Sequence, residues 1–130
     1  MPLTYDRLIL AKAESTYGTS AAPTGTDAIL VNNLSLSPLQ MELVDRELLY
    51  PYAGNRPRLT TVRLGAVSFD FELSGSGTAG TAPKTGVFFR AAGYSETIVA
   101  DTSVTYAPIG SSYEGITLDV RHGGKKHLLT

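Results

Sequence analysis

Three groups of residues in this sequence have the types and spacing that could do chemistry. Gly75, Gly77 and Gly80 have the G-x-G-x-x-G spacing of a dinucleotide-binding loop, whose backbone approaches a pyrophosphate. Such a loop follows a buried parallel strand, which is an unbroken apolar run, and leads directly into a helix. Here polar and apolar residues alternate over residues 67–74, and Pro83 delays the helix that follows. The pattern favours a flexible loop and leaves a small nucleotide-binding enzyme as the less favoured alternative.

The other two groups are a pair of histidines and a pair of carboxylates. His122 and His127 belong to one predicted hairpin, where they could bind a metal ion if a third ligand such as Asp119 faced them. Asp70 and Glu72 share one strand face about 7 Å apart, a separation that a glycosidase could use. Both patterns are also typical of solvent-exposed strand residues, and no nucleophile elbow accompanies them. We therefore predict no catalytic residue, no metal site and no cofactor.

Composition favours a mainly β protein of one domain covering residues 1–130. The chain is long enough to bury a core, and its 13 glycines and 7 prolines, with many Ser and Thr, indicate strands joined by turns. A net charge of −1 gives no electrostatic reason for tight DNA binding. The absence of cysteine excludes disulfides and thiolate metal sites. The N-terminus fits neither a signal peptide nor a membrane span, so we expect a soluble protein made in the cytoplasm.

Hydrophobic periodicity predicts a series of strands and one short helix. The strands are expected over residues 7–13, 28–31, 34–43, 58–74, 97–100, 102–108, 115–121 and 125–129. Gly123 and Gly124 separate the last two, and this pair suits a tight hairpin because both positions accept positive φ. After Pro83, apolar residues at helical spacing predict a helix over about residues 84–92, which Gly93 ends.

Two positions interrupt the alternation of the longest predicted strands. At Pro38 the apolar residues of one predicted strand change from even-numbered to odd-numbered positions. This change indicates an edge strand or a bulge, because proline cannot donate a hydrogen bond to a sheet ladder. At Gly65 the apolar residues of the strand predicted over residues 58–74 make the same change. A glycine at such a change predicts a β-bulge that bends the strand. We therefore expect a strongly curved sheet at Gly65.

Two long loops carry the predicted contacts with other molecules. They span residues 14–26 and 45–57, and loops of this length are uncommon in compact domains unless they are disordered or make contacts. Apolar residues in the second loop would be costly on an isolated monomer. The candidate inter-subunit residues are Tyr17, Gly18, Pro23, Tyr50, Tyr52 and Asn55.

A series of short runs resembles the major tail tube proteins of long-tailed bacteriophages. The runs are residues 12–19 with Pro23 and Thr24 behind them, then 73–83, 89–96 and 104–108. None is a catalytic signature, so the specificity lies in their order along most of the chain.

The resemblance implies a β-sandwich or barrel-like subunit with one flanking helix, whose copies form stacked hexameric rings around a channel. The tube would house the tape-measure protein, pass DNA without binding it specifically, and meet tail-terminator and tail-tip or baseplate proteins in the virion tail. Asp70 and Glu72 would face the lumen and repel phosphates. The two long loops would reach neighbouring subunits.

Other roles remain open on the sequence. Members of that family are generally longer, with further β-structure after the last hairpin, whereas this sequence stops within a predicted strand. A compact version, a truncated chain or a related piece used elsewhere all fit, and an exposed final strand would favour pairing with another chain. A tail-terminator, head-decoration or other virion accessory role is the nearest alternative.

Overall fold

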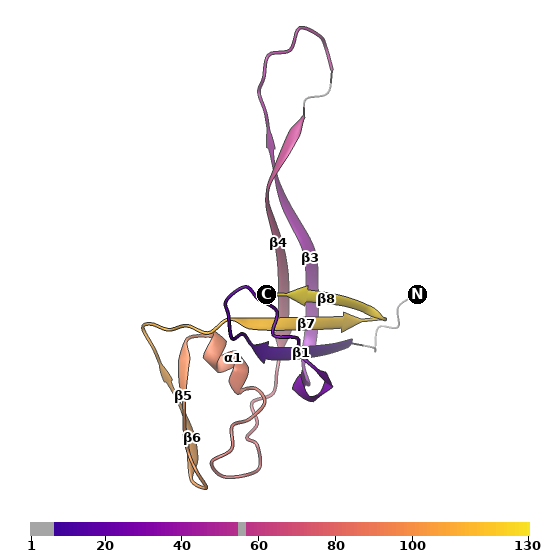
Figure 1. Cartoon of the computed structure of the whole chain (residues 1–130). Coiled ribbons are helices and arrows are strands. Elements are labelled where there is room, and N and C mark those ends of the chain that lie inside the picture. The colour runs from indigo at the N-terminus through magenta and orange to yellow at the C-terminus, as the bar shows by residue number, and fades with distance from the viewer. Residues whose placement is uncertain (1–6, 55–56) are drawn as a thin grey trace. The chain divides into compact units, whose positions relative to one another are not determined.

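The computed structural model describes residues 7–54 and 57–130, and the described chain is mainly β (Figure 1). The elements are β1 (Arg7–Ala13), the 3-10 helix η1 (Gly25–Asp27), β2 (Ala28–Ile29), β3 (Asn32–Asp45), β4 (Arg58–Asp70), α1 (Gly86–Ala91), β5 (Tyr94–Val99), β6 (Ser103–Pro108), β7 (Ile116–His122) and β8 (Lys125–Leu129). The strands form antiparallel sheets, one with four strands and two with two. Within the described ranges, no helix is long and apolar enough to cross a membrane. The prediction of a mainly β protein with one short α-helix is confirmed.

The chain divides into two compact units, where the sequence predicts a single domain. One unit comprises Met1–Asn32 with Phe71–Thr130, and the other is Asn33–Asp70. The second unit is the β3–β4 hairpin with its connecting loop, so it is an insertion in the sequence of the first.

The core of the first unit lies in the four-stranded sheet, whose order is β2-β1-β7-β8. Ile9 pairs with Val120 and Leu10 with Asp119 in the antiparallel register of β1 and β7. Neighbouring residues of a strand point to opposite faces, and Ile9 and Leu10 are both fully buried. The sheet is therefore covered on both faces at its centre, which explains why β1 is a continuous apolar run.

The β7–β8 hairpin has the turn that the sequence predicts. Gly123 and Gly124 both have positive φ, 55° and 78°, and they connect the opposed residues His122 and Lys125. Two consecutive left-handed residues are the geometry of a type I′ turn, whose twist matches that of the strands. The glycine pair therefore fixes the register of the hairpin.

An aromatic cluster connects α1 to the β5–β6 hairpin. Phe71 lies 5.1 Å from Phe88 between ring centroids, and Phe89 lies 5.1 Å from Tyr106 and 6.4 Å from Tyr94. The helix is shorter than predicted because the Pro83 carbonyl accepts a hydrogen bond from the N–H of Gly86, closing a turn before the first helical residue. The helix ends as predicted, because Gly93 follows it with a φ of +91°.

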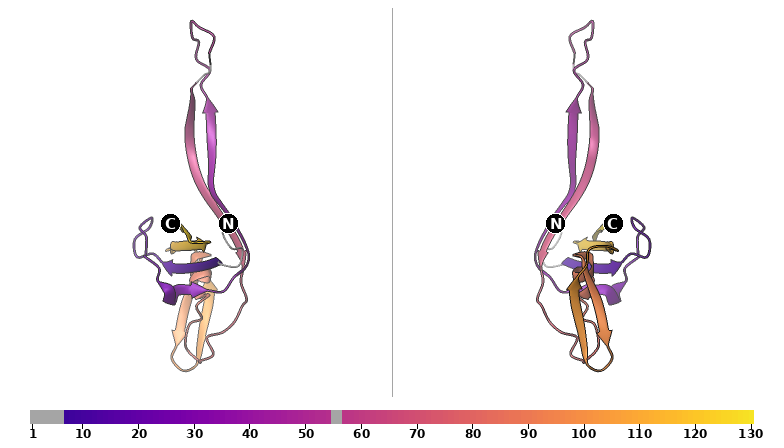
Figure 2. Two further views of the ribbon diagram at one scale, coloured as in Figure 1. Left: turned by 90° about the vertical axis from the view of Figure 1, so that its right-hand side faces the viewer. Right: turned by 90° about the vertical axis from the view of Figure 1, so that its left-hand side faces the viewer.

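The second unit is a long two-stranded ribbon (Figure 2). Three cross-strand contacts share one register: Asn33 with Asp70 at 2.7 Å, Glu42 with Thr61 at 3.3 Å, and Asp45 with Arg58 at 2.6 Å. This register places Pro38 opposite Gly65 and leaves no net extra residue on either strand between the first two contacts. A lone bulge at Gly65 would shift the register by one residue, whereas a matching irregularity at Pro38 on β3 would offset it. The bulge at Gly65 therefore stays a prediction, and the apolar alternation of both strands shifts at the same level.

The strand that was predicted to reach Ser74 ends at Asp70. Val67 and Phe69 are half-buried and alternate with exposed Ser68 and Asp70, as the sequence indicates. Phe71 continues the alternation, but its ring packs in the aromatic cluster of the first unit, outside any strand. An alternating sequence is therefore longer here than the strand it predicts.

Candidate functional site

The outer half of the β3–β4 ribbon is amphipathic. In the register above, alternate residues place five apolar side chains on one face. We call these residues the apolar stripe: Leu39, Met41, Leu43, Val62 and Leu64. Their exposed fractions run from 41% for Val62 to 59% for Leu64. A whole sheet face of large apolar side chains is thus open to water in the single chain.

The opposite face is polar beside the apolar stripe, where it carries Gln40 and Glu42 from β3 with Thr61 and Arg63 from β4, all exposed. Nearer the loop the same face also carries Val44 and Leu59, which are 46% and 49% exposed. Near the inner end of the ribbon the half-buried apolar residues have the other parity, as Leu36 and Val67 do, so the apolar side changes face at the level of Pro38 and Gly65. The apolar stripe therefore lies on the face opposite to the one that carries the half-buried apolar residues at the inner end of the ribbon.

The loop between β3 and β4 adds further apolar side chains. Leu49 is 98% exposed, and Tyr50 and Tyr52, two of the predicted contact residues, are also exposed with ring centroids 5.7 Å apart. Asn55, a third predicted contact residue, lies outside the described residues. The predicted loop and the apolar stripe thus belong to one hairpin.

Such a hairpin is not a stable arrangement for an isolated chain in water. A two-stranded ribbon is marginal by itself and normally needs a third strand or a packed layer. Contiguous exposed apolar surface of this kind marks an interaction site. The apolar stripe is therefore the strongest candidate for a functional surface in the described part of the chain.

The other predicted arm, residues 14–26, is held against its own unit. The Glu14 carboxylate accepts hydrogen bonds from the Gly18 N–H at 2.9 Å and from the Thr117 hydroxyl at 3.0 Å. The Thr117 hydroxyl in turn accepts from the Ala21 N–H at 3.0 Å. Thr117 is fully buried, so these bonds fix the loop to β7.

Because this loop is held against its own unit, its predicted contact residues differ in exposure. Pro23 is buried, so its proposed place at a subunit contact is corrected: it packs within its own chain. Tyr17 is 90% exposed and remains accessible. Gly18 has a φ of +74°, which suits the turn closed by Glu14.

Asp70 and Glu72 do not lie on one strand. Asp70 is the last residue of β4, and its carboxylate accepts a hydrogen bond from the Asn33 amide. Glu72 lies beyond the strand and is exposed. The assumption of a shared strand face is therefore wrong, whereas their suggested place in a lumen stays a prediction.

The histidine pair and Asp119 do not converge. His127 lies opposite Val120, the residue next to Asp119, and His122 has the parity of Val120. Both histidines therefore point away from the face that holds Asp119. The Asp119 carboxylate instead pairs with Arg121 and Lys126. Among the described residues, no cluster of three His, Asp or Glu side chains could hold a metal ion.

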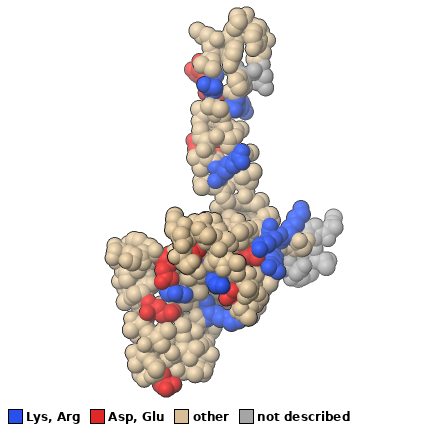
Figure 3. Space-filling model, viewed as in Figure 1, with Lys and Arg blue, Asp and Glu red and all other residues tan. Residues whose placement is uncertain are grey.

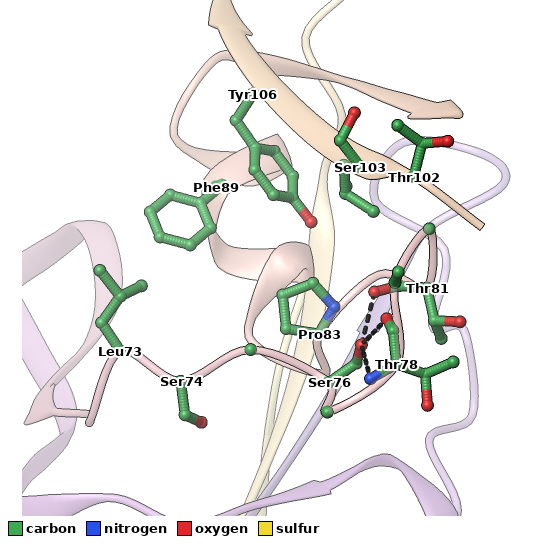
Figure 4. Close-up of a pocket in the computed structure, with 15 residues that line it drawn as sticks. Leu73, Ser74, Ser76, Thr78, Thr81, Pro83, Phe89, Thr102, Ser103 and Tyr106 are labelled. Atoms are coloured by element: carbon green, nitrogen blue, oxygen red, sulfur yellow. Dashed lines mark hydrogen bonds between the residues drawn. The ribbon is translucent and has the colours of Figure 1, made fainter. Parts of the chain in front are cut away.

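The glycine loop lines a shallow groove of about 600 Å³ (Figure 4). Phe89 and Tyr106 form an aromatic wall, and the loop supplies small and hydroxyl side chains with no charged residue in the lining. The Ser76 hydroxyl lies 2.9 Å from the Thr78 carbonyl and 2.7 Å from the Thr81 carbonyl, so the loop satisfies its own polar groups.

The surroundings of this loop differ from those of a dinucleotide site. Gly75 follows the end of β4 by five residues, and α1 begins six residues after Gly80. The helix has six residues and the described sheets are antiparallel. The strand–loop–helix unit that gives the glycine spacing its meaning is thus missing from this part of the described chain.

Tyr106 contains the most perturbed ionisable group near the groove. Burial of the ring, followed by the hydrogen bond to Glu96, raises the pKa of the Tyr106 hydroxyl to about 12. The Tyr106 hydroxyl donates to the Glu96 carboxylate at 2.6 Å. Both groups sit where a Cβ on Gly86 would be, so the glycine at the start of α1 makes room for the pair.

Comparison with known proteins identifies no matching family model, no similar curated protein and no similar solved structure. Function is therefore inferred from the residues of this chain and their geometry.

Proposed function

We propose that this chain is a structural subunit of a bacteriophage tail tube, which assembles with copies of itself into stacked hexameric rings. The finer expectation of a sandwich or barrel-like tail tube fold belongs to this proposal. The channel would house the tape-measure protein and pass DNA, and the ends of the tube would meet tail-terminator and tail-tip or baseplate proteins. The observation that carries the proposal is the apolar stripe on the β3–β4 ribbon.

A second copy of the chain is the occupant that this surface fits best. An antiparallel ribbon exposes strand edges with unpaired backbone groups, and strand pairing or face packing with an identical ribbon satisfies both edges and apolar side chains. The loop with Leu49, Tyr50 and Tyr52 would extend that contact. Self-assembly therefore removes the main cost that the single chain carries in water.

The experiment introduces one charge on either face of the ribbon. Met41→Glu places a carboxylate in the apolar stripe, and Gln40→Glu places the same group on the polar face one residue away. We expect the wild type and Gln40→Glu to form rings or tubes in negative-stain micrographs as concentration rises, and Met41→Glu to remain a monomer in analytical ultracentrifugation. Burying an unpaired carboxylate costs several kcal/mol, enough to abolish the contact.

Two results would contradict the proposal. Discrete monomers of the wild type at every concentration would exclude self-assembly, and equal tube formation by both variants would exclude the apolar stripe as the contact. Melting temperatures of the two variants provide the control, because both positions are exposed in the single chain and neither change should unfold it.

The lumen assignment has its own test in assembled particles. We expect the combined change Asp70→Lys and Glu72→Lys to slow DNA ejection, because positive charges on a channel wall hold phosphates that negative charges repel. The Asn33→Ala variant is the control, since it removes the hydrogen bond to Asp70 but keeps both charges. Ejection at the wild-type rate by the double variant would place these carboxylates elsewhere.

A further inference from the structure

The β7–β8 hairpin concentrates positive charge in a chain whose net charge is −1. Residues 121–127 contain Arg121, Lys125 and Lys126 with two histidines and no acidic residue. Figure 3 shows Lys and Arg side chains gathered at the end of the sheet where β7 and β8 meet in Figure 1. We call Arg121, His122, Lys125 and Lys126 the basic tip. The assembly role proposed above makes no use of it.

A buried carboxylate positions two of these cations. Arg121 lies directly opposite Lys126 in the β7–β8 register, a placement that is unfavourable for like charges. Asp119 offsets the repulsion, because its Oδ2 lies 3.2 Å from Arg121 and 3.3 Å from Lys126. Asp119 is fully buried, whereas the side chains of Arg121 and Lys126 are 50% and 55% exposed. Both cations are thus held at one end and open to solvent along the rest.

The basic tip surrounds a concave surface. A pocket of about 530 Å³ is lined by Arg121, Lys125 and Lys126 together with Leu8, His122 and Gly124. The lining carries three cations, and the Asp119 carboxylate that pairs with two of them leaves an excess of two positive charges. Arg7 lies opposite His122 in the β1–β7 register and adds a further cation at this end of the sheet. The lining contains one apolar side chain, Leu8, and one aromatic ring, the His122 imidazole.

We propose that the basic tip binds the phosphate backbone of nucleic acid without reading its base sequence. Phosphate contacts need charge and flexible donors alone, which the tip supplies. A docked peptide needs apolar or aromatic anchors in a pocket, and Leu8 is the one apolar side chain present. Base recognition uses several stacking platforms and partners for the base edges, whereas the lining offers a single ring, the His122 imidazole. The site therefore fits a weak, salt-sensitive contact with a phosphate chain.

The test measures binding of a fluorescent oligothymidylate of about 20 nucleotides by anisotropy. Three phosphate contacts to a single strand give a log–log salt slope of about −2, so raising NaCl from about 25 to about 150 mM should weaken binding about 40-fold. Lys125→Gln with Lys126→Gln should leave one contact, so the same salt change should then weaken binding only about fourfold. Lys125→Gln alone, which leaves both Asp119 pairs intact, should give an intermediate loss.

The matched control is Arg63→Gln with Lys84→Gln, which removes two exposed cations far from the tip in the sequence. We expect it to bind as the wild type does, and melting temperatures to confirm that every variant is folded. An equal loss in the control, or no binding of the wild type at low salt, would overturn the site. Competition by polyglutamate at equal charge as strong as that by DNA would show an acidic polypeptide as the occupant and refute the nucleic-acid assignment.

Discussion

At the scale of single residues, Tyr106 links a side-chain contact to a measurable dependence on pH. Its folded-state pKa of about 12 exceeds the ordinary value of 10.0, first because of burial and then because of the Glu96 hydrogen bond. A raised pKa means that the folded state keeps its proton after the unfolded state has lost it. The stability that the hydroxyl contributes is therefore complete below about pH 10 and is lost as pH rises towards 12.

We expect Tyr106→Phe to remove that window of the pH dependence. Urea midpoints of the wild type should fall more steeply than those of the variant between about pH 10 and 12. Tyr113→Phe is the matched control, because Tyr113 is 66% exposed and should leave the wild-type profile unchanged. Parallel profiles for the wild type and Tyr106→Phe would mean that the hydroxyl titrates as an ordinary phenol.

The sequence predicted the exposure of the tyrosines among the contact residues, but it did not predict the burial of Pro23. Tyr17, Tyr50 and Tyr52 are exposed, as a contact role requires. The burial of Pro23 was missed because it depends on the bonds that hold residues 14–26 to Thr117, a partner 96 residues from Ala21 in the chain. Local composition carries no trace of so distant a contact. Glu14, an acidic residue at the start of this loop, is the one sequence feature that hints at such anchoring, because its carboxylate can accept hydrogen bonds from the loop.

At the scale of elements, the glycine loop and the β5–β6 hairpin constrain one another. A Cβ on Gly80 would lie 2.6 Å from the Val99 carbonyl oxygen and would also collide with the backbone of Asp101. Gly77 has a similar positive φ, but nothing lies within 4 Å of the position of its Cβ. The two glycines thus separate the cost of backbone conformation from the cost of a clash.

We expect Gly77→Ala to cost about 1 kcal/mol through its left-handed conformation. Gly80→Ala should cost about 2 kcal/mol more, because two backbone segments must also move apart. Urea denaturation of both variants measures the difference. Equal destabilisation would show that the loop moves freely away from the hairpin turn.

The strands and turns were predictable where their signals are local. β1 coincides with the predicted range, and the two glycines of the β7–β8 turn fix that hairpin. The β3–β4 hairpin was predictable only in part. The sequence shows that the apolar alternation shifts at Pro38 and at Gly65, but it does not show that these two residues lie opposite each other. Pairing is a property of two segments together. The bulge predicted at Gly65 considers one strand alone, whereas the register depends on both strands.

At the scale of the whole molecule, the apolar core and the apolar stripe belong to different units. The fully buried apolar residues Ile9, Leu10 and Val120 all lie in the unit that contains the four-stranded sheet. The ribbon of Asn33–Asp70 contributes none of them. Folding and assembly should therefore be separable by removing the ribbon.

The decisive variant replaces residues 33–70 with a short Gly-Ser linker. The 2.7 Å hydrogen bond between Asn33 and Asp70 shows that the two cut ends are adjacent, so a flexible linker can join them without strain. We expect a monomer that keeps cooperative thermal unfolding and a β circular-dichroism spectrum but forms no tubes at any concentration. Tubes from this variant would show that the first unit drives assembly, and loss of cooperative unfolding would show that the first unit needs the ribbon to fold. Because the basic tip lies in the retained unit, nucleic-acid binding by the variant would persist, which separates that site from assembly.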